Sequence, residues 1–296
     1  MQEVIEKARV LIEALPYIQR FRGEVVVVKF GGSAMENEDH ADGVLYDVTF
    51  MECVGMRPVI VHGGGKAISR GLKTKGIETK FVKGLRVTCE NSIDVVEQVM
   101  NHEINPGIVE KLINTGARAR GMHGQDIFRV RRKVERCSET GAELDLGRVG
   151  DPIEVDTASV LECIHEDVIP VITPLGTGED GLTHNMNADT AAAALAATLK
   201  AAKLVYLTDV PGLLRDPGDE SSVLSHLNVN EVEALVHQGV IDGGMMPKIE
   251  SGVQALLSGV DKIHMIDGRM DHSLLLEIFT DKGVGTEIVQ SEEKDN

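Results

Sequence analysis

Aromatic residues are scarce in this sequence: it has no tryptophan, three tyrosines and six phenylalanines, and aromatics make up 3% of its 296 residues. Platforms that bind single-stranded nucleic acid stack bases on aromatic rings, so this scarcity argues against such binding. Positive charge is also scarce, because 30 Lys and Arg face 47 Asp and Glu and the net charge is −17. A nucleic-acid-binding surface would have to overcome that field. The one basic cluster, RVRRKVER at 129–136, is more simply a solvated strand or hairpin face.

Cysteine pairs and metal-ligand motifs are lacking as well. The four cysteines are far apart and form no CxxC pair, which indicates reduced thiols in a cytosol-like compartment; they are Cys53, Cys89, Cys137 and Cys163. The ten histidines show no HExxH spacing, so we expect no metal held by the protein itself. No apolar stretch reaches membrane-spanning length, and charged residues between positions 3 and 13 argue against a signal peptide. We expect a cytoplasmic protein without a membrane or nucleic-acid partner.

Continuous apolar runs are present, and they alternate with helical patterns. Runs rich in β-branched residues are typical of strands buried on both faces; here they are 25–28, 58–61, 168–172, 203–207 and 262–266. Amphipathic patterns predict helices at about 40–56, 66–75, 92–115, 157–166, 188–201, 229–239 and 247–259. This order predicts βαβ units and an α/β fold with a mainly parallel sheet. Residues 128–155 alternate in hydrophobicity and contain glycines, which predicts β-hairpins that cover a site.

The chain divides into an N-terminal helix and two predicted lobes. Residues 1–22 have an amphipathic helical pattern, which Pro16 should kink or end. This helix has two equally open uses: it can cover its own domain or reach a neighbouring subunit. We place a lobe boundary at the Ala-rich helix near residue 190, which gives an N-lobe at 23–190 and a C-lobe at 191–296. The sheet can still continue across that boundary.

Two glycine clusters each follow an apolar run. In KFGGS at 29–33, Lys29 closes a predicted strand and Gly31 and Gly32 follow; in HGGGK at 62–66, three glycines precede a predicted helix. Ligands of open α/β sheets bind beyond the carboxyl ends of strands. Glycines let a phosphate approach the backbone N–H groups at a helix N-terminus. A P-loop is excluded because the lysine of HGGGK is not followed by Ser or Thr. The alternatives are an ordinary strand-end lysine and a tight βα turn, although one glycine would suffice for such a turn.

Two polar motifs follow. Arg86 stands beside a glycine in GLRVT, and its planar guanidinium suits a carboxylate, although an ordinary surface arginine fits equally well. NMNADT places Asn185, Asn187 and Asp189 at the start of a predicted helix. Asn and Asp are favoured helix caps, but a helix needs only one. The surplus indicates contact with a ligand or the orientation of a lysine.

The C-terminal half adds two more motifs. Asp209 follows a strand in LTDVPGLL, where it lines either a nucleotide pocket or a plain turn. Lys248 follows Pro247 in GGMMPK, and proline suits the first turn of a helix. The helix dipole disfavours a cation at this end, so Lys248 indicates a compensating anion such as a phosphate, unless it is merely exposed. With Lys29, this second lysine predicts a phosphoryl-transfer enzyme.

Taken together, KFGG, HGGGK, GLRVT, NMNAD, LTDVPG and GGMMPK, in this order and spacing, resemble the amino acid kinase family, and within it the N-acetylglutamate kinases. The resemblance covers nearly the whole chain and implies a three-layer αβα sandwich with acetylglutamate in the N-lobe and ATP in the C-lobe. It implies that Lys29 and Lys248 stabilise the transferring phosphoryl group and that Asp189 holds both lysines. The residues implied to bind N-acetylglutamate are Gly64, Gly65, Arg86 and Asn185. Those implied to flank ATP are Gly31, Gly32, Asp209, Gly212 and Leu214.

The acceptor implied by this resemblance is the side-chain carboxylate of N-acetyl-L-glutamate, which yields N-acetylglutamyl 5-phosphate in arginine biosynthesis. A carboxyl group with a pKa near ~4.3 is ionised at neutral pH, so no general base is needed. Nucleophile and γ-phosphate are both anionic, and Mg²⁺ carried by the ATP together with the two lysines can offset their repulsion. The alternatives are the same chemistry on N-acetyl-aminoadipate and a non-catalytic amino-acid sensor of this fold. The presence of both lysines and Asp189 argues against the sensor.

Both ends of the chain resemble arginine-inhibited, hexameric members of the family. Residues 6–23 resemble their N-terminal helix, which interlaces dimers into a ring, and residues 272–288 resemble the segment that forms their arginine site. This implies a homohexamer with arginine as allosteric inhibitor, bound near Glu287 and the loop 283–285. Some members of the family also bind a nitrogen-signalling protein, but no segment here predicts that partner.

Overall fold

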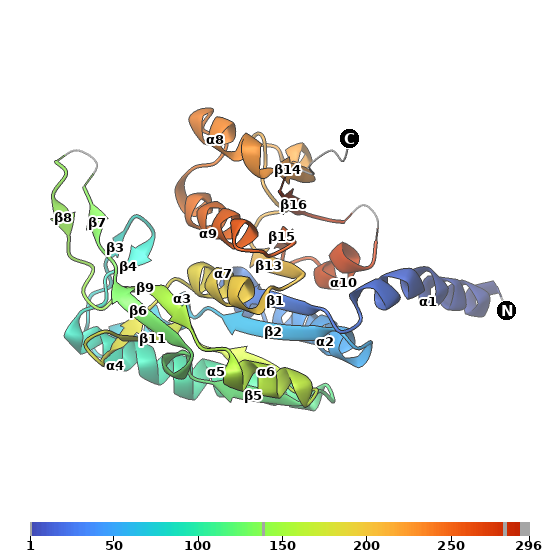
Figure 1. Cartoon of the computed structure of the whole chain (residues 1–296), viewed down its shortest axis with the longest axis horizontal. Coiled ribbons are helices and arrows are strands. Elements are labelled where there is room, and N and C mark those ends of the chain that lie inside the picture. Colours follow the sequence, from blue (N-terminus) through green and yellow to red (C-terminus); the bar gives the residue numbers. More distant parts are fainter. Residues whose placement is uncertain (1, 138–139, 281–282, 291–296) are drawn as a thin grey trace.

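The computed structural model describes residues 2–137, 140–280 and 283–290. Its centre is an eight-stranded sheet in the order β14-β16-β15-β13-β1-β2-β10-β5 (Figure 1). All neighbouring strands are parallel except β15 and β16. The strands are β1 (Val25–Phe30), β2 (Arg57–His62), β5 (Ala119–Met122), β10 (Ile169–Ile172), β13 (Lys203–Thr208), β14 (His226–Asn228), β15 (Lys262–Asp267) and β16 (Thr286–Val289). The predicted α/β fold with a mostly parallel sheet is confirmed.

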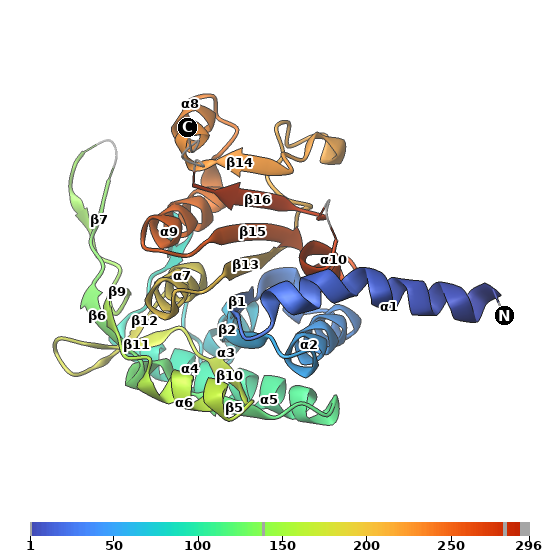
Figure 2. The same ribbon diagram turned by 45° about the vertical axis from the view of Figure 1, so that its right-hand side comes forward.

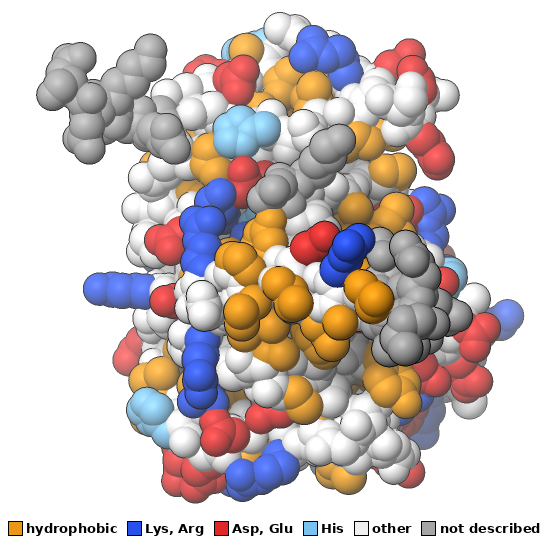
Figure 3. Space-filling model, turned by 90° about the vertical axis from the view of Figure 1, so that its right-hand side faces the viewer, with side chains coloured by type: hydrophobic (Ala, Val, Ile, Leu, Met, Phe, Trp, Pro, Cys, Tyr) orange, Lys and Arg blue, Asp and Glu red, His pale blue; other side chains and the backbone are white. Residues whose placement is uncertain are grey.

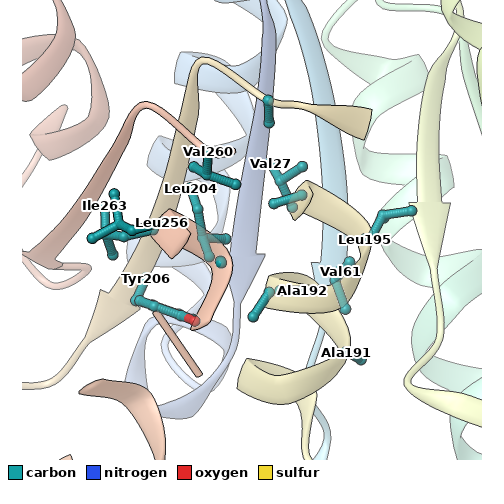
Figure 4. Close-up of a cluster of buried hydrophobic side chains, with 14 of the residues drawn as sticks. Val27, Val61, Ala191, Ala192, Leu195, Leu204, Tyr206, Leu256, Val260 and Ile263 are labelled. Carbon is teal, nitrogen blue, oxygen red and sulfur yellow. The ribbon is translucent and has the colours of Figure 1, made fainter. Parts of the chain in front are cut away.

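Helices cover both faces of this sheet. Along β1, Val27 packs into one hydrophobic cluster, whereas Val26 and Val28 pack into a second cluster on the opposite face, as expected where side chains alternate. Figure 4 shows the first cluster, in which α7 lies against β1, β2 and β13. Its helices are α6 (Ala158–His165), α7 (Ala188–Leu199), α8 (Val229–His237) and α9 (Met246–Leu257). The second cluster has α2 (Glu38–Cys53), α5 (Asn105–Asn114) and α10 (Ser273–Ile278). The result is the expected αβα sandwich.

The region 128–155, predicted to form hairpins, contributes its two outer strands to a second sheet, in the order β12-β11-β6-β9, while its two inner strands form a sheet of their own. Within the second sheet β6 pairs antiparallel with β9, and the chain between them forms the smaller hairpin of β7 and β8. The strands are β6 (Phe128–Arg132), β7 (Glu135–Arg136), β8 (Glu143–Leu144), β9 (Gly150–Val155), β11 (Leu175–Gly178) and β12 (Thr183–Asn185). The basic cluster at 129–136 lies on this hairpin, as its simpler interpretation predicts. A short pair, β3 (Phe81–Val82) and β4 (Leu85–Arg86), stands apart.

The single helix predicted at 92–115 is three connected segments. α4 (Glu90–Val99) is followed by a π-helical turn, η2 (Met100–Ile104), and then by α5. The N–H of Asn105 bonds to the carbonyl of Met100, five residues back. Pro106, at the start of α5, has no N–H and its ring would clash with the carbonyl four residues back in a regular helix. The wider π-helical turn accommodates this proline without that clash.

Helix α1 (Gln2–Phe21) projects from the body of the molecule (Figure 2). Pro16 lies inside it and does not end it, so the alternative of termination at Pro16 is wrong. Water can reach the exposed helix there and satisfy the carbonyl that the proline leaves free. Val10, Leu11 and Ile12 are 62%, 68% and 67% exposed, and hydrophobic side chains gather on the face from which α1 projects (Figure 3). Along this stretch α1 does not cover its own domain.

The sheet brings polar residues from both predicted lobes to one edge. β1 pairs with β2 on one side and with β13 on the other, so the sheet is continuous across the boundary near residue 190. Because these strands are parallel, their carboxyl ends meet, and Lys29 and His62 lie there. Parts of the expected segments, namely residue 1, 138–139, 281–282 and 291–296, lie outside the described residues. Among the residues described, no helix combines the length and apolar character that crossing a membrane requires.

Candidate active site

A cavity of about 1110 Å³ opens at this edge of the sheet. Its lining includes predicted site residues from several separate segments, namely Lys29, Gly32, Gly64, Gly65, Arg86, Asn185, Asp189 and Asp209. Four other described residues predicted for the site do not line it: Gly31, Gly212, Leu214 and Lys248. The cavity therefore brings the two glycine turns, the arginine and the NMNAD motif together around one space.

Lys29, Asp189 and Lys248 form one ion cluster at the wall of this cavity. The Lys29 ammonium lies 3.0 Å from Asp189 Oδ1, and the Lys248 ammonium lies 2.5 Å from Asp189 Oδ2. The three side chains are 9%, 8% and 18% exposed, respectively. Two lysines far apart in the sequence thus converge on one carboxylate. Lys29 comes from the end of β1 and Lys248 from the first turn of α9.

Burial and charge together set the protonation of this cluster. Burial raises the pKa of the Asp189 carboxyl, but the two adjacent ammonium groups outweigh it and hold that pKa below its usual value. Burial lowers the pKa of the Lys248 ammonium, Lys29 lowers it further, and Asp189 opposes both. Asp189 is therefore ionised at neutral pH. Its charge keeps two cations side by side that would otherwise repel each other.

The NMNAD motif divides its polar groups between capping and the cavity. Asn187 accepts hydrogen bonds from the N–H groups of Asp189 (2.7 Å) and Thr190 (3.2 Å), so this one side chain caps α7. Asp189 is left free for the lysines. Asn185, at the end of β12, lines the cavity and donates to Thr88 Oγ1 over 3.3 Å. The surplus of polar residues in this motif is accounted for.

Tyr206 contacts both α7, which carries Asp189, and α9, which carries Lys248. It is fully buried in β13, and its hydroxyl lies 3.4 Å from the backbone oxygen of Asp189 and 3.1 Å from Ser251 Oγ of α9. The backbone of Asp189 and the helix that carries Lys248 are therefore both held by contacts to strand β13. This arrangement fixes the separation of the two cations more firmly than long lysine side chains could alone.

Helix α3 (Gly65–Thr74) begins at the cavity. Gly64 is its N-cap and offers no side-chain cap, so the first N–H groups of the helix remain available to an anion. A Cβ on Gly64 would lie 2.5 Å from both Met100 Sδ and Ile104 Cδ1. Glycine is therefore what lets this turn pack against the π-helical turn η2.

Arg86 is anchored beside the same turn. Its Nη2 donates to the carbonyl of Gly65 (2.6 Å) and to Ser69 Oγ (2.9 Å), and its guanidinium carbon lies 4.8 Å from the centroid of the Phe81 ring. The side chain is buried, with 7% exposure. A guanidinium held in this way presents its remaining donors in a fixed direction, which suits a carboxylate ligand.

The remaining predicted residues have other surroundings. A Cβ on Gly31 would lie 3.2 Å from Lys29 Nζ, so glycine leaves room for the ammonium group there. A Cβ on Gly212 would lie 2.7 Å from Thr286 Oγ1, which places Gly212 against β16. Leu214 forms a bridge with Val223. Asp209 does line the cavity.

Sequence reasoning missed one wall of the cavity. Side chains and backbone of the α4–α5 segment form this wall, namely Met100, Glu103, Ile104, Gly107, Ile108 and Lys111. It also missed an ion pair between Lys66 and Glu36, two further lining residues. These positions lie within ordinary helical and loop patterns, and Pro106 was the only local signal of an irregular wall.

Residues 272–288 take part in a second buried polar cluster, together with Lys203 and His264. The Lys203 ammonium lies 2.9 Å from His264 Nε2, and His264 Nδ1 lies 2.6 Å from Glu277 Oε1. Glu277 Oε2 accepts from the N–H groups of Val284 (2.6 Å) and Gly285 (3.2 Å). Because the ammonium has only donors, His264 accepts at Nε2 and donates at Nδ1.

The end of α1 and Glu287 adjoin this cluster. The Lys203 ammonium lies 4.9 Å from the centroid of the Phe21 ring, near the end of α1. Glu287 pairs with Lys262 at 2.6 Å and contacts His226 at 3.2 Å. A buried polar network therefore joins the 283–285 loop to the N-terminal helix.

Lys203 predicts a measurable pH dependence of stability. Burial, with some repulsion from Lys262, lowers the pKa of Lys203 to about 8 in the folded chain, against 10.5 for an unperturbed lysine. Between these two values the unfolded chain binds more protons, so this group makes the fold more stable as the pH rises. Urea unfolding at pH 7.5 and 9.5 should show a gain for the unmodified chain, relative to Lys203→Met, of about 2 kcal/mol. Parallel pH dependences of the two chains would contradict the argument.

Among the residues described, no group of three or more His, Cys, Asp or Glu side chains is arranged to hold a metal ion. The cavity offers ammonium groups, a guanidinium and backbone N–H groups, which are ligands for phosphate and carboxylate oxygens. The fold and site together define a class of enzyme that binds anionic groups at the carboxyl edge of a parallel sheet.

Comparison with known families places the chain. The model of the amino acid kinase family matches residues 24–267. The chain therefore belongs to the amino acid kinase family.

Curated relatives and solved structures agree with this placement. Acetylglutamate kinase of Heliobacterium modesticaldum is 47% identical over 295 residues, which are 98% of this chain and 100% of that protein. Acetylglutamate kinase of Methanothermobacter thermautotrophicus is 44% identical over 97% of this chain and 100% of that protein. N-acetylglutamate synthase from Neisseria gonorrhoeae, solved with coenzyme A and N-acetyl-glutamate, has a TM-score of 0.81 and 26% identity; the match covers 96% of this chain and 63% of that one. Carbamate kinase from Giardia lamblia, at 14% identity and a TM-score of 0.65, shares the fold over 91% of this chain and 99% of its own.

Proposed function

We propose that this chain transfers the γ-phosphoryl group of ATP to the side-chain carboxylate of N-acetyl-L-glutamate and so makes N-acetylglutamyl 5-phosphate for arginine biosynthesis. The observation that carries the proposal is the ion cluster of Lys29, Asp189 and Lys248: Lys29 and Asp189 line one large cavity beside a glycine turn, and Lys248 pairs with Asp189 at its border. Full-length similarity to acetylglutamate kinases supports the choice of acceptor.

The chain's own residues account for the chemistry. Two ammonium groups on one carboxylate can stabilise the charge that spreads over the phosphoryl oxygens in the transition state. The acceptor carboxylate is ionised at neutral pH and needs no general base. ATP brings Mg²⁺, which neutralises phosphate charge when the nucleotide is bound. Arg86, fixed by Gly65 and Ser69, would hold a carboxylate of the acceptor, and the uncapped start of α3 would hold an anionic oxygen.

The division of labour follows the two predicted lobes. In this proposal residues 23–190 bind the acceptor through Gly64, Gly65, Arg86 and Asn185, and residues 191–296 bind ATP. Asp209, which directly follows β13, lines the cavity, and it would contact the nucleotide in this proposal. Gly212 and Leu214 of the C-lobe, together with Gly31 and Gly32 contributed by the N-lobe, complete the proposed nucleotide site; Gly31 would act by leaving room for the Lys29 ammonium.

Trapping of the product tests this function directly. The chain, ATP, Mg²⁺ and hydroxylamine are incubated with N-acetyl-L-glutamate, and the acyl hydroxamate is measured. A signal that requires all components supports the proposal, and its absence refutes it. N-acetyl-aminoadipate in the same assay separates the two acceptors, and a kcat/KM larger for the longer acid would replace glutamate by its homologue.

Arginine control and hexamer formation are a second part of the proposal. The exposed apolar residues Val10, Leu11, Ile12 and Leu15 suit helix contacts between subunits. Phe21, at the end of the same helix, contacts the buried Lys203–His264–Glu277 network beside the 283–285 loop. A ligand bound in this region, next to Glu287, would lie close to both the end of α1 and the 283–285 loop. We propose that arginine binds there and inhibits the enzyme.

Removal of α1 tests this regulation. Deletion of residues 2–20 should convert a hexamer into a smaller assembly, and it should raise the arginine concentration for half-inhibition at least about fivefold. Light scattering and arginine titration of activity give the two readouts. The paired variant Leu11→Glu, Ile12→Glu should reproduce the change of assembly with the helix present. Unchanged assembly and arginine response in the deletion would refute this part of the proposal.

A further inference from the structure

His62 is a fully buried histidine at the end of β2, directly before the glycine turn. Its Nδ1 lies 2.9 Å from the carbonyl oxygen of Gly63. Its Nε2 lies 3.2 Å from Nδ2 of the buried Asn105, which also donates to the carbonyl of Val171 over 2.8 Å. Neither side chain lines the cavity, and both lie directly behind residues that do.

These contacts select one form of the imidazole. The side-chain nitrogen of Asn105 carries two hydrogens and no acceptor, so His62 must accept at Nε2. The ring proton is then on Nδ1, and it donates to the Gly63 carbonyl. Burial lowers the pKa of His62 to about 4, so the ring is neutral at pH 7.

The orientation of one peptide group follows from this hydrogen bond. The C=O of Gly63 and the N–H of Gly64 belong to the same planar trans peptide, so they point in opposite directions. A carbonyl held toward the buried His62 turns the Gly64 N–H away from it. The N–H of Gly63 is also fixed, because it donates to the carbonyl of Phe30 over 2.7 Å. Without such restraints a glycine turn would sample several peptide orientations.

Asn105 is held in place by the irregular helix around it. Its N–H closes the π-helical turn on Met100, and Pro106 follows it. A Cβ on Gly121 would lie 2.1 Å from Asn105 Oδ1, so the glycine in β5 makes room for this amide. The same π-helical turn presses Met100 and Ile104 against Gly64. The π-helical turn and strand β5 therefore hold Asn105 in place, and the same π-helical turn packs against the glycine turn at Gly64.

We propose that His62 and Asn105 are positioning residues that fix the Gly63–Gly64 peptide and so aim the Gly64 N–H at the acceptor substrate. Neither touches the reacting atoms. Asn105 fixes the tautomer of His62, and His62 in turn fixes the orientation of the Gly63–Gly64 peptide. The inference rests on the proposed kinase function, since it assigns the orientation of a backbone group in the acceptor site.

Four variants in steady-state kinetics test the positioning role. His62→Leu removes the donor to Gly63, whereas His62→Asn keeps an N–H close to the position of Nδ1. Asn105→Ala leaves His62 in place but frees its tautomer. Thr49→Val is the matched control: it removes a buried hydroxyl, paired with Thr115 at 2.6 Å, that does not line the cavity. Melting temperature is measured for every variant.

The expected result separates the two substrates. His62→Leu and Asn105→Ala should raise the KM for N-acetylglutamate about tenfold and lower kcat, as the loss of one aimed hydrogen bond would. The KM for ATP should stay within about twofold, and His62→Asn should recover most of the loss. Thr49→Val should change only the melting temperature. Equal defects in His62→Asn and His62→Leu, or equal changes in both KM values, would overturn the proposal.

A second readout needs no turnover and no folded His62→Leu variant. ¹⁵N NMR of the chain labelled at histidine, with the His62 signal assigned by its absence in His62→Asn, should show a proton on Nδ1 and none on Nε2. Asn105→Ala should shift the ring toward the other tautomer. An active chain with the proton on Nε2 would overturn the positioning role. A chain that shows the expected tautomer but forms no acyl phosphate would instead refute the proposed function.

Discussion

Replacement of Lys248 by alanine should lower kcat by roughly 10²–10³-fold, by analogy with the removal of one charge-stabilising donor from an acyl-transfer site. The ammonium lies 2.5 Å from Asp189 and is largely buried, so no nearby water replaces its charge fully. The transition state spreads negative charge over the phosphoryl oxygens, and the Lys248 ammonium would stabilise that charge more than the charge of the bound substrates. The KM values for ATP and acceptor should therefore change by less than about threefold. Initial-rate kinetics with each substrate varied in turn measures both quantities.

Two further variants make this test specific. Lys73→Ala removes the same charge from an exposed position of α3 that does not line the cavity, so its kinetics should match the unmodified chain. Lys248→Arg keeps the charge in a larger, planar group and should recover part of kcat. A Lys248→Ala chain with near-normal kcat would remove Lys248 from the catalytic role. A chain that loses only ATP affinity would make it a binding residue.

Much of the fold could be predicted from the sequence because its strands are buried on both faces. A run such as VVVV at 25–28 has no alternation, and in the structure its residues feed clusters on opposite faces of the sheet. The elements that were missed carry weak local signals. β5, with the sequence ARGM, is partly exposed at the edge of the sheet, and α10 has only six residues. Such short elements are stabilised by tertiary contacts, which a local pattern does not contain.

The contact of Asp189 with both lysines could be inferred because NMNAD visibly exceeds a local rule. NMNAD has more capping groups than one helix can use, and the structure assigns the cap to Asn187 and leaves Asp189 to the lysines. The roles of His62 and Asn105 could not be inferred in this way. His62 looks like part of a glycine motif, and Asn105 looks like one polar residue in a long helix. Their contact depends on how far the π-helical turn rotates α5, which is a property of the packed fold.

Replacement of Asp189 by asparagine should be the other large effect, and its pH dependence distinguishes it from a simple loss of structure. The carboxylate opposes the burial and the Lys29 repulsion that already lower the pKa of Lys248. Without its charge that pKa falls further, so Lys248 loses its proton at a lower pH than in the unmodified chain. We expect kcat at neutral pH to fall by about 10²–10³-fold, since the two cations are no longer held together by one carboxylate. Because the protonated form is the active one, part of the activity should return as the pH is lowered.

The control is Asp189→Glu, which keeps the negative charge but extends it by one methylene group. It should lose activity through misplacement without gaining the new pH dependence, because both lysines stay paired. Breaking the buried cluster should also destabilise Asp189→Asn by up to about 3 kcal/mol, so the profiles are measured below its melting temperature. The decisive comparison is the pH at which log kcat begins to fall as the pH rises, which should be lower for Asp189→Asn. If Asp189→Asn and the unmodified chain lose activity at the same pH, Asp189 does not hold Lys248 in its charged form, and the electrostatic account of this cluster is wrong.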